Sequence, residues 1–241
     1  MFDLAAGEVG LVFAAFITST ATAILGAGGG VLLLTLMPGL IPAHAIIPVH
    51  AIVQLASNVS RVAFAWRSVR WDMLRRYFLG ACIGALAGSQ IVLSINAQYV
   101  PLILGVTILL ITWLPSLSTD RLPGRFLSFG VIHTFLATLA GATGPMSGAF
   151  LSREGLKKDS LVTTTATFMA TAHGLKVVAF ALLGFSLAPY LKLVLWMAAG
   201  VILGSWVGTL LRKKLPEFSF TRIFRWVITL LALRLIWIAL V

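Results

Sequence analysis

Long apolar runs, separated by short groups of glycine, proline and charged residues, divide the chain into ten segments. They cover residues 8–26, 29–38, 44–66, 73–95 and 99–114 in the first half, and 126–142, 145–152, 160–184, 189–211 and 221–240 in the second. Because a helix rises only about 1.5 Å per residue, the second segment of each half is too short to cross a bilayer alone.

The composition indicates that these segments lie in lipid. Hydrophobic residues make up 59% of the chain and charged residues 10%, and the mean hydropathy is +1.02, well outside the range of soluble domains. Residues 78–99 alone form an uncharged run of the length that a bilayer crossing needs. Spans in lipid are helical because each backbone group must find its partner within the segment. We therefore predict an all-α, multi-pass integral membrane protein.

Charge and cysteine content exclude several other classes. The formal net charge is +11, but the basic residues stand in short clusters between apolar runs, as in cytoplasmic membrane loops. We therefore expect a lipid bilayer and no nucleic acid as partner. Cys82 is the only cysteine, which excludes disulfides within the chain and thiolate metal clusters. We expect no metal and no cofactor, and a homodimer is compatible with the sequence.

The two halves align with each other, which predicts an internal duplication. At a shift of 115 residues the aligned pairs are Gly26 with Gly141, Gly29 with Gly144, Leu36 with Leu151, Asn58 with His173 and Arg61 with Lys176. At a shift of 120, Gly80, Gly84 and Gly88 fall on Gly200, Gly204 and Gly208, at a spacing that lets helices approach closely. We divide the chain into a first transmembrane repeat, 1–115, a connecting loop, 116–124, and a second repeat, 125–241.

Three basic clusters predict the topology. They lie within residues 61–76, 153–158 and 212–225. If all three face the cytoplasm, segments 126–142 and 145–152 must together return to the side they left. The second repeat then has inverted topology, both chain ends lie outside, and each repeat has a broken or re-entrant helix pair plus three spanning helices. The alternative is a plain helical bundle with an accidental charge bias.

Two glycine-rich turns are candidates for anion binding. Gly26, Gly28, Gly29 and Gly30 precede or open one short segment, and Gly141, Gly144 and Pro145 stand in the same place in the second half. Glycine lets backbone N–H groups approach a ligand, and the start of the following helix carries partial positive charge. In inverted-repeat transporters such broken helices meet around the substrate. The alternative is that these glycines only permit a tight hairpin.

A polar stripe follows each turn, in segments 44–66 and 160–184. Its members recur at helical spacing, and each stripe includes a histidine and a cation. A charge within a span is costly enough to indicate function, although Arg61 and Lys176 could instead reach the membrane interfaces. The candidate substrate-binding residues are Gly28, Gly29, Gly30, His50, Gln54, Asn58, Arg61, Thr143, Gly144, Thr167, Thr171, His173 and Lys176.

The acidic residues limit the coupling mechanism. All seven stand near segment ends or in loops, so no carboxylate is expected at the membrane centre for a sodium or proton site. Coupling would then depend on histidines or on the substrate's own proton, which favours a uniporter or a proton-linked carrier. The sequence contains no nucleophile motif or paired acid, so we predict no enzyme and no catalytic residues. An anion channel and a non-transporting scaffold remain alternatives.

The same residues resemble the TauE/SafE family of sulfite exporters and organosulfur anion permeases. The family's Gly-rich start resembles residues 26–30, its basic loop with Trp-Asp resembles residues 67–72, and its second-half lysine resembles Lys176. Thr143 stands where the family often has glycine, and Pro38 comes later than the family's proline. The resemblance implies a transporter of sulfite, sulfonates or related small anions in a bacterial inner membrane.

Overall fold

The computed structural model is all-helical and describes residues 5–26, 28–94, 96–113, 124–141, 143–214 and 221–240. Ten α-helices form within these residues. They are α1 (Ala6–Leu25), α2 (Gly29–Leu36), α3 (Ala43–Phe64), α4 (Trp71–Ser94), α5 (Val100–Trp113), α6 (Arg125–Ala140), α7 (Gly144–Ser152), α8 (Lys158–Leu182), α9 (Leu191–Arg212) and α10 (Thr221–Leu240).

The ten helices coincide with the ten predicted segments to within a few residues at each end. Among the described residues, α1, α3, α8 and the stretch Ala188–Arg212 are long and apolar enough to cross a membrane. Shorter apolar helices lie at Val100–Trp113 and Arg125–Leu139. The all-helical, multi-pass prediction is therefore confirmed. The predicted connecting loop, 116–124, lies outside the described residues except for Gly124.

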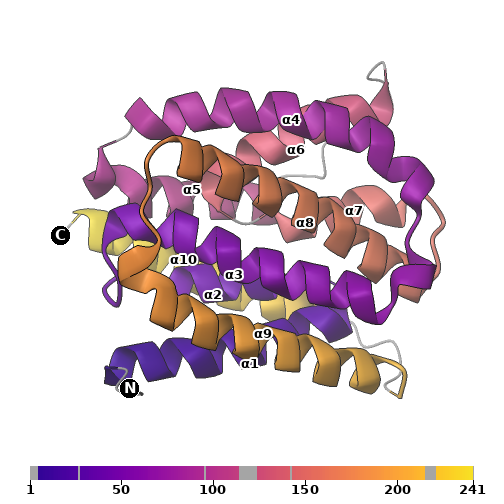
Figure 1. Ribbon diagram of the computed structural model, residues 1–241, viewed down its shortest axis with the longest axis horizontal. Helices are drawn as coiled ribbons and strands as arrows, with labels where there is room; N and C mark the ends of the chain where they lie inside the picture. Colours follow the sequence, from indigo (N-terminus) through magenta and orange to yellow (C-terminus); the bar gives the residue numbers. More distant parts are fainter. Residues whose placement is uncertain are drawn as a thin grey trace.

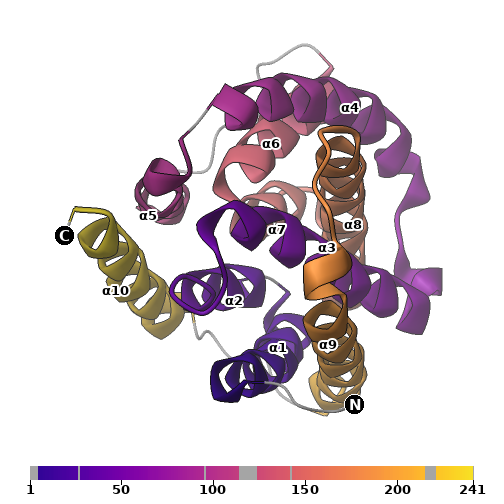
Figure 2. The same ribbon diagram turned by 60° about the vertical axis from the view of Figure 1, so that its left-hand side comes forward.

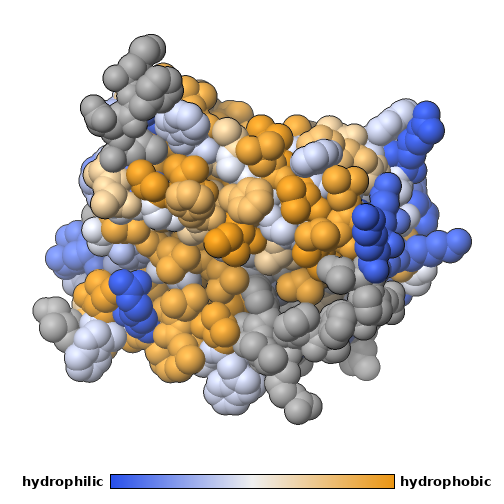
Figure 3. Space-filling model, turned by 90° about the horizontal axis from the view of Figure 1, so that it is seen from below, coloured by the Kyte–Doolittle hydropathy of each residue, from blue (hydrophilic) through white to orange (hydrophobic). Residues whose placement is uncertain are grey.

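The helices run along the long axis of the molecule, with an apolar surface between its two ends. In Figure 1, α1 begins and α10 ends at the left, whereas the α3–α4 connection and the end of α9 lie at the right. Seen from below, hydrophobic residues cover the middle and hydrophilic residues gather toward the two ends (Figure 3). Phe13 on α1, Leu86 on α4 and Leu230 on α10 are among the exposed large apolar side chains. This surface suits contact with lipid tails.

Two close helix pairs form opposite sides of the molecule. Helix α4 packs along α6, and α1 packs along α9. Figure 2 shows the α4–α6 pair at the top and the α1–α9 pair at the bottom, with α2, α3, α7 and α8 between them. Helices α5 and α10 pack on each other at a third side. The central four helices are therefore enclosed by pairs that each join the two halves of the chain.

Glycines determine how closely both pairs approach. A Cβ atom on Gly84 would overlap the carbonyl oxygen of Val131 in α6, and one on Gly204 would overlap the carbonyl oxygen of Phe16 in α1. Val131 and Phe16 themselves align at the shift of 115 residues. The predicted packing role of the glycines is thus confirmed. Small residues allow this backbone contact within a membrane, where association depends on van der Waals packing.

The short helices α2 and α7 each follow a glycine-containing reversal of the chain. Gly26 and Gly28 have φ angles of 92° and 102°, and Gly141 has a φ angle of 75°. L side chains rarely adopt these angles, so glycine is required for the reversal. Helix α2 then begins at Gly29, and α7 at Gly144 with Pro145 in its first turn. Proline suits this position because the first helical N–H groups have no partner within the helix.

Candidate functional site

A pocket lies where both glycine turns meet the polar stripes of α3 and α8. Its lining residues come from α1, α2 and α3 in the first half and from α7 and α8 in the second. They are Thr22, Gly26, Gly28, Gly30, Val31, Gln54, Asn58, Arg61, Gly144, Met169 and His173. Seven of the thirteen candidate residues predicted from the sequence thus border one cavity. The two glycine turns, far apart in sequence, face the same space.

The pocket is narrow in this conformation. Its volume is about 20 Å³, which is room for about one water molecule. The side chain of Gln54 contributes to this, because it lies directly over the Cα of Gly30. An anion larger than a water molecule would therefore require the surrounding helices to separate.

Arg61 is the cation that borders the pocket. It is 3% exposed, so it does not extend to the membrane interface. One terminal nitrogen donates to the Ser57 hydroxyl at 2.8 Å, while Nε has no partner. Ser57 in turn lies 2.8 Å from the Ser19 hydroxyl, which donates to the carbonyl of Val201. The guanidinium group is therefore anchored on one side by hydroxyls of α1 and α3 and retains hydrogen-bonding capacity on the other.

Lys176, the aligned residue in the second half, has a different environment. It is fully buried, and its Nζ donates to the carbonyl oxygens of Ala137 at 3.0 Å and Gly141 at 2.9 Å. Gly141 is the C-cap of α6, where carbonyls have no partner within the helix, and the carbonyl of Ala137 also accepts the N–H of Gly141. Lys176 therefore caps α6 and is not among the residues that line the pocket. Both cations are buried within the protein rather than extended along its surface.

Three buried histidines lie close to the two glycine turns, and they differ in their hydrogen bonds. His133 is fully engaged, with Nδ1 at 2.8 Å from the Tyr77 hydroxyl and Nε2 close to the hydroxyls of Thr143 and Ser147. His50 donates from Nε2 to the carbonyl of Gly30 at 2.8 Å. His173 lines the pocket, and neither of its ring nitrogens has a partner among the described residues.

The remaining candidates lie beside the pocket rather than on it. A Cβ atom on Gly29 would overlap the carbonyl oxygen of Thr18, so this glycine permits close packing of α2 on α1. Thr143 bonds to His133. The hydroxyls of Thr167 and Thr171 donate to carbonyls four residues earlier in their own helix. These three threonines therefore already have hydrogen-bond partners within the protein.

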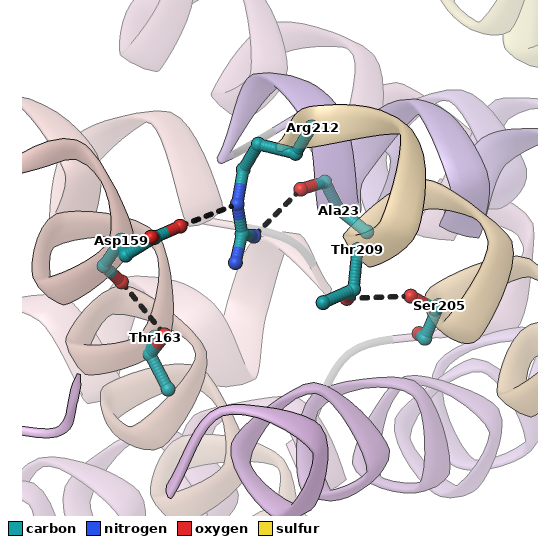
Figure 4. Close-up of polar contacts among 6 residues, drawn as sticks. All are labelled: Ala23, Asp159, Thr163, Ser205, Thr209 and Arg212. Carbon is teal, nitrogen blue, oxygen red and sulfur yellow. Dashed lines mark hydrogen bonds and ion pairs between the residues drawn. The ribbon is translucent and has the colours of Figure 1, made fainter. Parts of the chain in front are cut away.

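Arg212 is an important residue that the sequence pattern alone did not single out. Its Nη1 donates to the carbonyl of Ala23 at 2.8 Å, and its Nε forms an ion pair with Asp159 at 2.9 Å (Figure 4). Figure 4 shows the guanidinium group extending from the end of α9 between α1 and α8. Arg212 thus caps α1 from another helix. Arg212 aligns with no residue of the polar stripes and stands in a basic cluster. The sequence therefore gave no reason to expect a capping role.

Chemistry at the site depends on hydrogen bonding and charge. Among the described residues, no group of three or more His, Cys, Asp or Glu side chains could hold a metal ion. The pocket instead combines one guanidinium group, one imidazole ring, two amide side chains and the backbone of four glycines. Guanidinium and backbone N–H donors of this kind bind oxyanions.

Comparison with known proteins identifies the family of the chain. A family model described as sulfite exporter TauE/SafE matches residues 11–235, which is most of the chain. Comparisons with curated proteins and with solved structures give no match. The match covers both glycine turns, both polar stripes and every residue that lines the pocket. The chain therefore belongs to the TauE/SafE sulfite exporter family.

Proposed function

We propose that this protein carries sulfite, sulfonates or related organosulfur anions across a bacterial inner membrane by alternating access. Family membership implies a membrane transporter of sulfur anions and suggests a protein that is not an enzyme. The anion would bind between the N-terminal ends of α2 and α7, within the pocket that Arg61 borders. His50, Gln54, Asn58, His173 and Lys176 would contribute at or behind this position.

The main support for the proposal is the environment of Arg61. A buried guanidinium group without a carboxylate partner is costly in a membrane protein, because its charge and its donors have lost water. Arg61 is buried and has one hydrogen bond to Ser57, while its Nε has no partner beside the pocket. A sulfite or sulfonate group supplies the missing charge and two acceptor oxygens for a pair of hydrogen bonds from the guanidinium group.

The starts of α2 and α7 add a second source of positive potential. The first N–H groups of a helix lack partners within it, and the helix end carries roughly half a positive charge. Gly28 and Gly30 at the start of α2, and Gly144 at the start of α7, line the same pocket. Because glycine has no side chain, an oxyanion could approach the backbone directly.

Repeated packing contacts support two inverted repeats, 1–115 and 125–241, as the framework for alternating access. Exchanging the halves converts the α1–α9 pair into the α6–α4 pair, and both pairs pack closely. Gly80 faces the carbonyl of Leu127, as Gly200 faces that of Val12 at the same shifts. An inverted pair of halves can exchange conformations, and that exchange would open a central site first to one side and then to the other.

The test is a thermal-shift screen of the purified protein against sulfite, sulfate, thiosulfate, taurine and sulfoacetate. At a concentration of a hundred times Kd, a ligand adds about 2.7 kcal/mol of stability, which shifts the melting temperature measurably. We expect sulfite or a sulfonate to raise it in the wild type and Arg61→Gln to abolish the shift. Arg225→Gln is the matched control, because Arg225 is exposed and stacks on Trp113 away from the pocket.

Sulfite flux into proteoliposomes then separates the alternatives. A carrier shows saturable uptake that is accelerated by sulfite on the opposite side, whereas an anion channel shows no such acceleration. A scaffold shows no flux. If no anion shifts the melting temperature and no flux is detected, the proposed function is overturned.

A further inference from the structure

We infer that His173 takes up a proton when the anion binds, so that the protein moves an anion and a proton together in the same direction. This inference rests on the proposed function and adds the coupling ion to it. It begins from the position of an imidazole ring that has no hydrogen-bond partner beside the pocket.

His173 differs from the other two buried histidines in this respect. His133 has partners on both nitrogens, and His50 has one on Nε2. His173 is 1% exposed, lines the pocket and has no partner on either nitrogen among the described residues. A buried polar atom without a partner is destabilising, because it has lost its hydrogen bonds to water. An anion in the pocket would satisfy an imidazole N–H donor directly.

The groups that face His173 are either cationic or neutral. The charges that act on it are Lys176 on the same helix, Arg61 and His50 on α3, and His133 on α6. The rings of His50 and His173 lie 5.8 Å apart, edge to face. Tyr77 of α4 bonds to His133, and the nine residues of α7 include no titratable side chain. Among the described residues, no carboxylate is buried near this group.

Anion binding and protonation of His173 are therefore linked. In the empty pocket, a proton on His173 would add positive charge beside Arg61 and Lys176, and repulsion opposes it. A bound anion removes that repulsion and accepts a hydrogen bond from the imidazolium ring. By linkage, the proton in turn increases the affinity for the anion by the same factor. Each ligand thus favours the doubly loaded state over either half-loaded state.

The step conserves charge and atoms without any redox partner. Water on the loading side supplies a proton to the free imidazole nitrogen while the anion enters. Both leave on the other side when the pocket opens there, and His173 returns to the neutral form. The net charge moved per cycle is the charge of the anion plus one.

The experiment compares three proteins in proteoliposomes that contain a trapped pH dye, with sulfite as the probe. They are the wild type, His173→Asn and His44→Asn. His44 is the control because it is exposed and bonds to Tyr190 away from the pocket. Sulfite carries protons itself, but it does so equally for all three proteins. The difference between variants therefore isolates the contribution of His173.

We expect the wild type and His44→Asn to carry about one proton more per sulfite than His173→Asn does. Protonation of His173 should raise the affinity for sulfite by about fivefold or more, so an inward proton gradient should accelerate wild-type uptake. His173→Asn should bind sulfite more weakly, and the uptake that remains should respond much less to the gradient. His173→Gln replaces His173→Asn if the latter is not monodisperse after purification.

Equal proton-to-sulfite ratios in the wild type and the variant would overturn the inference, while leaving the proposed transport function intact. A wild-type uptake rate that does not change with the proton gradient would also overturn the inference. This measurement requires neither variant. Absence of saturable sulfite uptake in the wild type would instead overturn the proposed function itself.

Discussion

Arg61 and Lys176 occupy aligned positions in the two halves but make different contacts. Lys176 donates to two carbonyls at the end of α6, whereas Arg61 donates to Ser57 and borders the pocket. The corresponding end of α1 is capped by Arg212, which reaches it from α9. Because Arg212 takes over the capping role, Arg61 remains available to a ligand. Lys176 and Arg212 thus cap helix ends in the two halves, and Arg61 is left for the proposed anion site.

The largest effect should come from removing the α6 cap. Lys176→Ala leaves the carbonyl of Gly141 without its side-chain donor and opens a cavity in the core. We expect a loss of roughly 2–4 kcal/mol in stability, seen as a large drop in melting temperature in detergent. Arg61→Ala should lower the melting temperature less. If Lys176→Ala melts like the wild type but fails to bind sulfite, the division of roles is wrong.

Removing the cap of α1 tests the division of roles between Arg212 and Arg61. In Arg212→Gln, the carbonyl of Ala23 loses its donor. Arg61 is a second buried cation that feels the charge of Arg212, and we expect its guanidinium group to move toward the vacated carbonyl. We expect a loss of about 1–3 kcal/mol in stability together with a weaker thermal shift by sulfite. The measurement is the same melting assay with and without sulfite. An undiminished sulfite shift would show that Arg61 does not move to the vacated cap.

Glycine substitutions test whether the two helix pairs are equivalent. A Cβ on Gly84 or on Gly204 meets a backbone carbonyl of the partner helix. Overpacking of this kind costs about 1–3 kcal/mol, so Gly84→Ala and Gly204→Ala should lower the melting temperature by similar amounts. Gly10→Ala is the control, because a Cβ there meets nothing within 4 Å. A strong effect at only one of the two positions would show that the two helix pairs contribute unequally to stability.

The smallest effect should come from Asp159→Asn. The Asp159 side chain is 55% exposed, so its ion pair with Arg212 is screened by water. Exposed pairs contribute at most about 1 kcal/mol, and Arg212 retains its bond to Ala23 in this variant. We expect a melting temperature close to that of the wild type and little dependence on salt. A loss as large as that of Arg212→Gln would make Asp159 part of the cap.

The helices and the pocket were predictable from the sequence because their signals are local. Lipid requires apolar runs of fixed length, and glycine marks the places where the chain reverses at positive φ. The alignment of the halves then placed both glycine turns and the residues Asn58, Arg61 and His173 around one space, and the structure brings these residues to one pocket.

The division of roles among the cations was not predictable in this way. The partners of Lys176 are backbone carbonyls at the end of α6. Because every residue has a carbonyl group, the sequence cannot indicate which one accepts a hydrogen bond. Arg212 stands in a cluster of basic residues that is typical of a cytoplasmic loop. Its side chain nevertheless extends to the carbonyl of Ala23 in α1. The threonines of α8 bond to their own helix, an option that helical spacing alone does not distinguish from a lining role.

The shortness of α2 and α7 has an electrical consequence. With eight and nine residues, each helix is only about 12–14 Å long, about half of the roughly 30 Å of a bilayer's hydrocarbon core. In the proposed site, an anion held between the two helix starts would divide that low-dielectric barrier into two thinner parts. The membrane voltage would fall mainly across these parts, where one elementary charge gains about 2.3 kcal/mol per 100 mV. An interior-negative cell would thereby drive a dianion outward, and a co-transported proton would halve the charge that the voltage acts on.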